Sequence, residues 1–295
     1  MKETSSSRRR FIKLASGAAA VGALGVGAHA TLIEPNRPRL VRQEILLRRL
    51  PLAFDGLTIL QLSDFHYDSH FSATPIAAAV RMANDLKPDL IVLTGDFVTS
   101  PVFHRPFLMR HSVALIEPCV DSLRGLIAPY GTWAVLGNHD VFSDPHHVQT
   151  ALRRAGIQVL YNGAVPVERG GRRFWLAGVG DVLAGQADLE KTLRCVTSTE
   201  TVVLLAHEPD FADHSARYPV DLQLSGHSHG GQVCFPFVGA VYLPKLARKY
   251  PRGLRQVGQL MVYTNVGIGT LLLPVRWNCP PEVTLITLRS LQPGK

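Results

Sequence analysis

Residues 90–96 read Leu-Ile-Val-Leu-Thr-Gly-Asp, a run of aliphatic residues that ends in a glycine and an aspartate. A short continuous apolar run is typical of a β-strand that is buried on both faces. A glycine directly after such a strand permits a tight turn. In open α/β sheets, ligands bind outside the carboxyl ends of the strands. This stretch therefore predicts a buried strand that delivers Asp96 to a site.

Four further apolar runs end in polar residues of the same kind. Leu57–Ser63 precedes Asp64-Phe65-His66, Thr132–Leu136 precedes Gly137-Asn138-His139-Asp140, Thr201–Ala206 precedes His207, and Asp221–Ser225 precedes Gly226-His227-Ser228-His229. Residues two apart on an extended chain project to the same side, as for Asp64 with His66 and for His227 with His229. Each motif alone is weak, because a single buried histidine is more often structural. Five strand ends that carry Asp, His and Asn together predict a metal site.

In the first part of the chain, predicted helices and strands alternate. In the second part, most of the predicted elements are strands. We expect helices from Thr74-Pro75 to Leu86, across Ser112–Leu126 with a kink at Pro118, and from Asp144-Pro145 to Gly156. A hairpin is expected from Val165–Glu168 and Arg172–Ala177, and further strands at Gln259–Thr264 and Val283–Leu288. This order predicts an α/β fold, a layered αββα sandwich of two mixed β-sheets flanked by helices.

Residues 1–30 differ from the rest of the chain. Ser7-Arg8-Arg9-Arg10-Phe11-Ile12-Lys13 leads into a weakly apolar stretch rich in Gly and Ala, which closes with Ala28-His29-Ala30. This layout is typical of an export signal with a cleavage site, and it resembles a twin-arginine signal. An uncleaved membrane anchor is the alternative. We expect a twin-arginine signal peptide at 1–30, a linker at 31–39 and one domain at 40–295. The twin-arginine translocation machinery is then a partner, and the location is the periplasm or cell envelope.

Charge and composition narrow the class of protein. The chain has 295 residues, 46% of them hydrophobic, which argues against disorder. The net charge of +8 falls to +4 without residues 1–30. No basic module rich in aromatic residues is visible, so nucleic-acid binding is not expected. The cysteines lack the short spacing of a zinc or redox motif and are expected to be buried free thiols; they are Cys119, Cys195, Cys234 and Cys279.

The ordered motifs D-x-H, G-D, G-N-H-D, a single His and G-H-x-H resemble those of the calcineurin-like metallophosphoesterase superfamily. Residues 226–232, 248–254 and 278–288 are similar to its exported bacterial phosphodiesterase branch. The resemblance implies two metal ions, Mn, Fe or Zn, bridged by Asp96. It implies His139 as a catalytic residue oriented by Asp140. The implied ligands are Asp64, His66 and His229 for one ion, and Asn138, His207 and His227 for the other.

The same resemblance implies a metal-dependent phosphoric ester hydrolase in which hydroxide attacks phosphorus in line. Residues 101–111 and 233–255 are apolar and basic together. They predict either ordinary packing or a rim that meets acyl chains and an anionic membrane. We therefore expect a phosphodiesterase or pyrophosphatase that acts on a phosphate ester of the cell envelope, a class of substrate that includes lipid-linked phosphates. The alternatives are an exported broad-specificity phosphatase or nucleotidase, and a non-catalytic metal-binding envelope protein.

Overall fold

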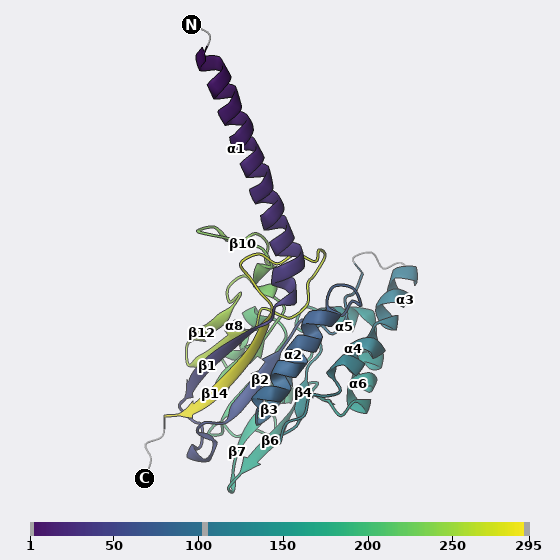
Figure 1. Ribbon diagram of the computed structural model, residues 1–295. Coiled ribbons are helices and arrows are strands. Elements are labelled where there is room, and N and C mark those ends of the chain that lie inside the picture. The colour runs from purple at the N-terminus through teal and green to yellow at the C-terminus, as the bar shows by residue number, and fades with distance from the viewer. Residues whose placement is uncertain (1–2, 102–105, 292–295) are drawn as a thin grey trace.

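Two six-stranded mixed sheets lie face to face, with helices on their outer faces (Figure 1). The computed structural model describes residues 3–101 and 106–291, and the side chains of 8–101 and 110–291. The first sheet has the order β1-β14-β2-β3-β4-β5 and the second the order β12-β13-β9-β8-β7-β6. The predicted αββα sandwich is therefore confirmed.

The bounds of the elements are as follows. The first sheet contains β1 (Arg39–Leu47), β2 (Thr58–Leu62), β3 (Leu90–Leu93), β4 (Thr132–Ala134), β5 (Gln158–Val159) and β14 (Glu282–Ser290). The second contains β6 (Gly163–Arg169), β7 (Arg172–Gly178), β8 (Val202–Leu205), β9 (Leu222–Ser225), β12 (Gly253–Val257) and β13 (Leu260–Thr264), and β10 (Cys234–Phe235) pairs with β11 (Gly239–Ala240). The helices are α1 (Glu3–Ala28), α2 (Ala73–Leu86), α3 (Pro106–Ala114), α4 (Ile116–Leu123), α5 (Asn138–Ser143), α6 (Pro145–Arg154), α7 (Leu189–Thr192) and α8 (Ala212–Ser215).

Alternation along the central strands builds the layers. Ile59 and Val92 join the core between the two sheets, whereas Leu60 and Ile91 join the core beneath α2, α4 and α6. Successive side chains of a strand point to opposite faces, so a strand buried on both faces must be apolar throughout. This requirement explains why the central strands read as continuous aliphatic runs.

The carboxyl ends of the two sheets meet at one edge of the sandwich. Strands β2, β3 and β4 run parallel in the first sheet, and β7, β8, β9 and β13 run parallel in the second. The buried side chain of Gln61, near the end of β2, donates from Nε2 to the carbonyl oxygen of Ser225 at the end of β9, at 2.9 Å. The loops that follow both sets of strands therefore face one another.

Several predicted boundaries need correction. The single kinked helix over 112–126 is wrong, because α3 and α4 are separated at Leu115. Pro118 is in the first turn of α4, where its missing N–H breaks no intrahelical bond. Helix α2 begins at Ala73, one residue before the predicted cap. The strands β1 and β12 were not predicted; both are sheet edges with many exposed or half-buried residues, so they lack a continuous apolar run.

The N-terminal helix projects away from the sheets (Figure 1). Arg8–Asn36 is long and apolar enough to cross a membrane, and a signal sequence near the N-terminus passes the same test. A π turn (His29–Ile33) and a 3₁₀ turn (Glu34–Asn36) occupy most of the predicted linker. They are fixed to the domain, because Arg276 N donates to Ala30 O at 2.9 Å and Cys279 N donates to Glu34 Oε1 at 2.7 Å.

The core between the sheets supplies a stability test. Phe174 is fully buried, with its ring edge-on to Phe54 at 5.0 Å. Phe174→Ala should lower the free energy of unfolding by about 3–5 kcal/mol, through lost burial and a cavity. Urea unfolding followed by circular dichroism measures this loss. The matched control is Phe237→Ala, which removes an exposed ring and should change the free energy by about 0.5 kcal/mol or less. Equal losses in the two variants would contradict the assigned core.

Candidate metal centre

The polar residues predicted at the strand ends gather where the carboxyl edges of the two sheets meet. Groups of potential metal ligands form there from His and Asp side chains whose ligand atoms lie within 4.8 Å of one another. All the predicted site residues except His139, which is half-buried, are buried: Asp64, His66, Asp96, Asn138, His207, His227 and His229.

The loops that carry these residues adopt a costly backbone conformation. Asp64, His66, Asp96, His227 and His229 have φ angles of 51°, 40°, 57°, 65° and 50°. Residues with a Cβ atom rarely adopt this left-handed region, and it persists only where surrounding contacts impose it. Here the loops bind one another: Asp64 N donates to Gly95 O at 2.9 Å, and His227 N donates to Asp64 Oδ1 at 2.9 Å.

One group of potential ligands comprises Asp64, His66 and His229. His229 Nε2 lies 3.4 Å from Asp64 Oδ1 and 3.0 Å from His66 Nε2. Burial, and then the neighbouring His66 ring, hold the pKa of His229 well below its usual value. A neutral imidazole presents a lone pair, so two imidazole nitrogens and a carboxylate oxygen converge as a cation would require.

A second group comprises Asp96, His207 and His227. His207 Nδ1 lies 2.6 Å from Thr94 O, and His227 Nε2 lies 2.9 Å from Lys245 O. Each histidine donates one ring N–H to a carbonyl, which leaves the other nitrogen free to bind a metal. The nearby motif atom Asn138 Oδ1 is buried without a hydrogen-bond partner. Buried polar atoms without partners are costly, and a bound cation would satisfy them.

Asp96 belongs to the second group and also lies beside His66 of the first. Its Oδ2 is 3.4 Å from His66 Nε2 and 3.1 Å from His207 Nε2, while Oδ1 accepts a hydrogen bond from His139 N at 2.9 Å. Burial alone would raise the pKa of Asp96, but the His207 and His139 rings outweigh it and hold that pKa well below the usual value. Asp96 is therefore a carboxylate. The buried clusters that it joins fit a dinuclear metal site.

The ring of His139 lies beside this centre, 4.8 Å from the ring of His66. Ser100 N donates to His139 Nδ1 at 3.0 Å, and Ser100 Oγ is 2.8 Å from the same atom. Because Nδ1 accepts this backbone hydrogen bond, the proton of the neutral ring is on Nε2. Burial lowers the pKa of His139 to about 4, so the ring is neutral at physiological pH.

The prediction that Asp140 orients His139 is wrong, since Ser100 does so. The Asp140 carboxylate instead accepts hydrogen bonds from the backbone N–H groups of Asp96, Phe97, Val98 and Gly137, at 2.8–3.2 Å. Burial, and then the charge of Asp96, raise the pKa of Asp140 to about 7. Asp140 thus fixes the loop that presents Asp96.

Sequence reasoning missed a buried arginine behind the centre. Arg276 is fully buried and donates to the carbonyl oxygens of Val266, Gly267, Gly269 and Cys279. Gly269 N in turn donates to Asp64 O at 2.8 Å. An arginine within a loop looks like a surface charge in a sequence, and nothing around residue 276 signals its burial. Ser100 is equally unmarked.

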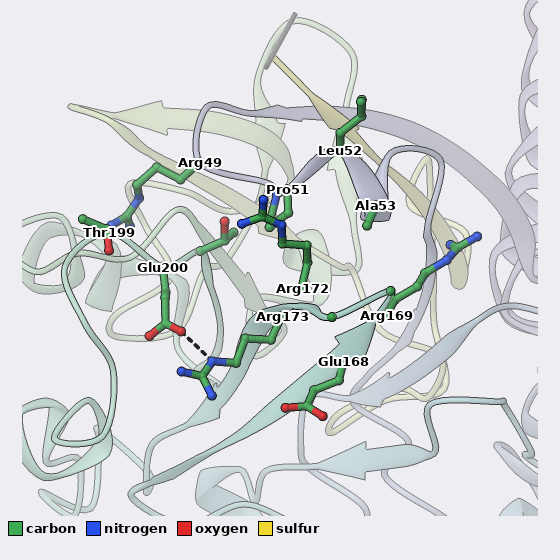
Figure 2. Close-up of a pocket in the computed structure, with 13 residues that line it drawn as sticks. Arg49, Pro51, Leu52, Ala53, Glu168, Arg169, Arg172, Arg173, Thr199 and Glu200 are labelled. Carbon is green, nitrogen blue, oxygen red and sulfur yellow. Dashed lines mark hydrogen bonds and ion pairs between the residues drawn. The ribbon is translucent and has the colours of Figure 1, made fainter. Parts of the chain in front are cut away.

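Part of the positive charge lies far from the clusters. A hollow of about 910 Å³ at the opposite edge is lined by Arg49, Arg169, Arg172 and Arg173, with Arg173 paired to Glu200 at 2.6 Å (Figure 2). Arg172 is at the start of β7, and His207 follows the end of β8, which runs parallel to β7. The hollow and His207 therefore lie at opposite ends of these two strands, so the arginines of this hollow lie at the other end from the metal motifs.

Comparison with known proteins places this site in a family. The model of the calcineurin-like phosphoesterases matches residues 57–231, a range that contains every predicted site residue. The chain therefore belongs to the calcineurin-like phosphoesterases and is a metal-dependent phosphoesterase. It is 37% identical to the uncharacterized metallophosphoesterase YkuE of Bacillus subtilis, covering 96% of this chain and 98% of YkuE.

Two further relatives carry named activities. The chain is 34% identical to the phosphodiesterase YaeI of Escherichia coli, covering 96% of this chain and 99% of YaeI. It is 26% identical to the UDP-2,3-diacylglucosamine pyrophosphatase LpxG of Chlamydia trachomatis, covering 87% of this chain and 91% of LpxG.

The close approach of Gly137 to the centre gives a prediction. A Cβ atom at Gly137 would lie 2.3 Å from Asp96 Oδ1 and 2.7 Å from His207 Nε2. Gly137→Ala should therefore displace both side chains and weaken metal binding by about tenfold or more. Metal content after dialysis, measured by mass spectrometry, checks this. Gly163→Ala is the control, because its Cβ would meet nothing closer than 3.9 Å. Full metal retention by Gly137→Ala would refute the assigned geometry.

Proposed function

We propose that this chain is a dinuclear-metal phosphodiesterase or pyrophosphatase that acts on a lipid-linked phosphate ester of the cell envelope. The observation that carries the proposal is the position of Asp96 Oδ2, which faces His66 on one side and His207 on the other. Two cations a few ångströms apart repel each other, and an anion between them offsets this repulsion. The named phosphodiesterase and pyrophosphatase activities of two relatives support this reaction class.

The proposed ligand assignment follows the two groups. Asp64, His66 and His229 would hold one ion, Asn138, His207 and His227 would hold the other, and the Asp96 carboxylate would serve both. The unpartnered Asn138 Oδ1 supports the second set. Nitrogen and oxygen donors together suit Mn, Fe or Zn.

When bound, the two ions supply Lewis-acid stabilisation of phosphoryl oxygens and lower the pKa of the attacking water. The chain's own residues position the substrate and transfer protons. His139, held by Ser100 with its proton on Nε2, donates that hydrogen bond to a phosphoryl or leaving-group oxygen. The buried Asp96 and Asp140 keep the loops of the centre fixed, so little reorganisation accompanies the reaction.

We propose that the N-terminal segment is a twin-arginine export signal and that the domain works in the periplasm or cell envelope. The Arg8-Arg9-Arg10-Phe11-Ile12-Lys13 stretch and the exposed helix α1 support this. The arrangement of the domain supports a membrane-facing rim. Figure 1 shows the β10 hairpin at the same end of the molecule as the base of α1.

We define the apolar rim as the exposed residues of this hairpin and of a neighbouring loop. The rim residues are 52–108% exposed: Phe235, Phe237, Val238, Val241, Tyr242, Leu272 and Leu273. The rim residues at 235–242 follow His229 in the chain. Leu272 and Leu273 follow Gly269, whose N–H donates to Asp64 O. An exposed apolar patch beside a site favours insertion among acyl chains.

The basic part of the predicted rim is smaller than expected. Arg252 points inward, with Nη2 2.8 Å from Cys234 Sγ, whereas Arg248 and Lys249 are exposed. Of the other predicted segment, 101–111, residues 102–105 lie outside the described residues. The rim proposal therefore depends on the 233–255 segment and on Leu272 and Leu273.

A pair of variants tests the metal assignment and the role of His139. His139→Ala should keep both ions and lower the turnover of bis-p-nitrophenyl phosphate by about 10²–10⁴-fold, because a proton donor is removed. Asp96→Asn should lose metal as well as activity, because the bridging charge is removed. Metal content and rate are measured on the same samples. The proposed assignment fails if metal-replete Asp96→Asn hydrolyses the diester at the wild-type rate. A faster reaction of the wild type with p-nitrophenyl phosphate would instead favour the broad-specificity phosphatase.

The apolar rim gives a second test in this section. Phe237→Ser combined with Tyr242→Ser should lower hydrolysis of a lipid phosphodiester in anionic vesicles by about fivefold or more, because the apolar contact with the bilayer is reduced. The rate on soluble bis-p-nitrophenyl phosphate should not change. Ile127→Ser is the matched control: Ile127 is 80% exposed but precedes β4, away from the carboxyl ends of the strands. Unchanged vesicle activity in the double variant would overturn the membrane-facing rim.

A further inference from the structure

Two of the four cysteines lie side by side next to the metal centre. The segments that carry them pair as parallel strands through a bridge between Val233 and Trp277. Cys234 N donates to Trp277 O at 2.8 Å, and Asn278 Nδ2 donates to Cys234 O at 3.0 Å. Backbone pairing therefore fixes the separation of Cys234 and Cys279, although 44 residues lie between them in the chain.

The two thiols share one environment. Arg252 Nη2 lies 2.8 Å from Cys234 Sγ and 3.5 Å from Cys279 Sγ. Together with Val266, the two cysteines form a small buried cluster. All four cysteines are free in this structure, and Cys195 is exposed, against the expectation that all four are buried.

The pair also supports the backbone of the loop that carries His227 and His229. Cys279 Sγ donates to His229 O at 3.2 Å, and Cys234 Sγ donates to Gly230 O at 3.2 Å. Arg252 Nη2 also donates to Gly230 O. A covalent link between the sulfurs would tie β10 to the segment that leads into β14, and it would remove the two thiol hydrogen bonds to this loop.

We propose that Cys234 and Cys279 are a redox pair that closes into a disulfide beside the metal centre. The reaction partner is a protein or small-molecule disulfide. The Cys234 thiolate attacks one sulfur of that disulfide and expels a first thiol. The Cys279 sulfur then attacks Cys234 and expels a second thiol. Two protein thiols are oxidised, one external disulfide is reduced, and their protons pass to the released thiols or to water.

Access and charge favour Cys234 as the attacking group. Cys234, which is 7% exposed, lines an open hollow of about 580 Å³ together with Arg252, whereas Cys279 is 2% exposed and does not line it. The neighbouring Cys279 thiol, and then the charge of Arg252, lower the pKa of Cys234 to about 6 against the effect of burial. Burial raises the pKa of Cys119 well above its usual value. The chain thus holds one reactive pair and, in Cys119, an inert buried thiol for comparison.

The experiment uses the full chain, oxidised with glutathione disulfide and then alkylated. Peptide mapping should show a Cys234–Cys279 link, and the thiol count in denaturant should fall by two per chain. Closing a long loop should raise the Tm by roughly 5–10 °C, and dithiothreitol should reverse the rise. Cys234→Ser and Cys279→Ser should each abolish the link and the shift. Cys195→Ser, which removes an exposed thiol, should retain both.

Two outcomes of the oxidation experiment would contradict a Cys234–Cys279 redox pair. Complete alkylation of Cys234 and Cys279 after oxidation, or a stable glutathione adduct on Cys234, would overturn the proposal. The mapping of the wild type decides the question even if a variant folds poorly. None of these measurements depends on hydrolysis, so the result stands apart from the proposed enzymatic function.

Discussion

The buried carboxylate of Asp96 is the constraint on which the rest of the site depends. One of its oxygens faces His66 and His207, and the other binds the backbone N–H of His139. A buried charge is costly unless it is paired, so the surrounding rings and N–H groups are obligatory partners. The same carboxylate joins loops from both sheets. The sandwich architecture therefore serves to bring two sets of strand ends within reach of one acidic side chain.

The sequence predicts this centre well because the decisive signals are local. Each buried strand is a continuous aliphatic run, and each polar group follows its strand within a few residues. The edge strands β1 and β12 escaped prediction because partial exposure lets their sequences mix charged and apolar residues. Ser100, Asp140 and Arg276 escaped for another reason: their roles are contacts with the backbone of distant loops, and such contacts leave no periodic pattern.

Charge and apolar surface are distributed differently from what the composition suggests. Several arginines line a hollow at the edge opposite the centre, and Arg252 is turned toward two cysteines. The segment that follows His229 carries exposed aromatic and aliphatic side chains, as does the loop of Leu272 and Leu273. The proposed recognition of a lipid-linked phosphate ester therefore combines apolar contact at the rim with phosphate binding at the clusters. It does not depend on a broad basic surface.

The most direct test of this account is anomalous X-ray diffraction from crystals of the full chain grown with manganese. The account predicts two anomalous peaks, one on each side of the Asp96 carboxylate, with Asp64, His66 and His229 around one and Asn138, His207 and His227 around the other. A single peak, or peaks that do not have Asp96 between them, would contradict it.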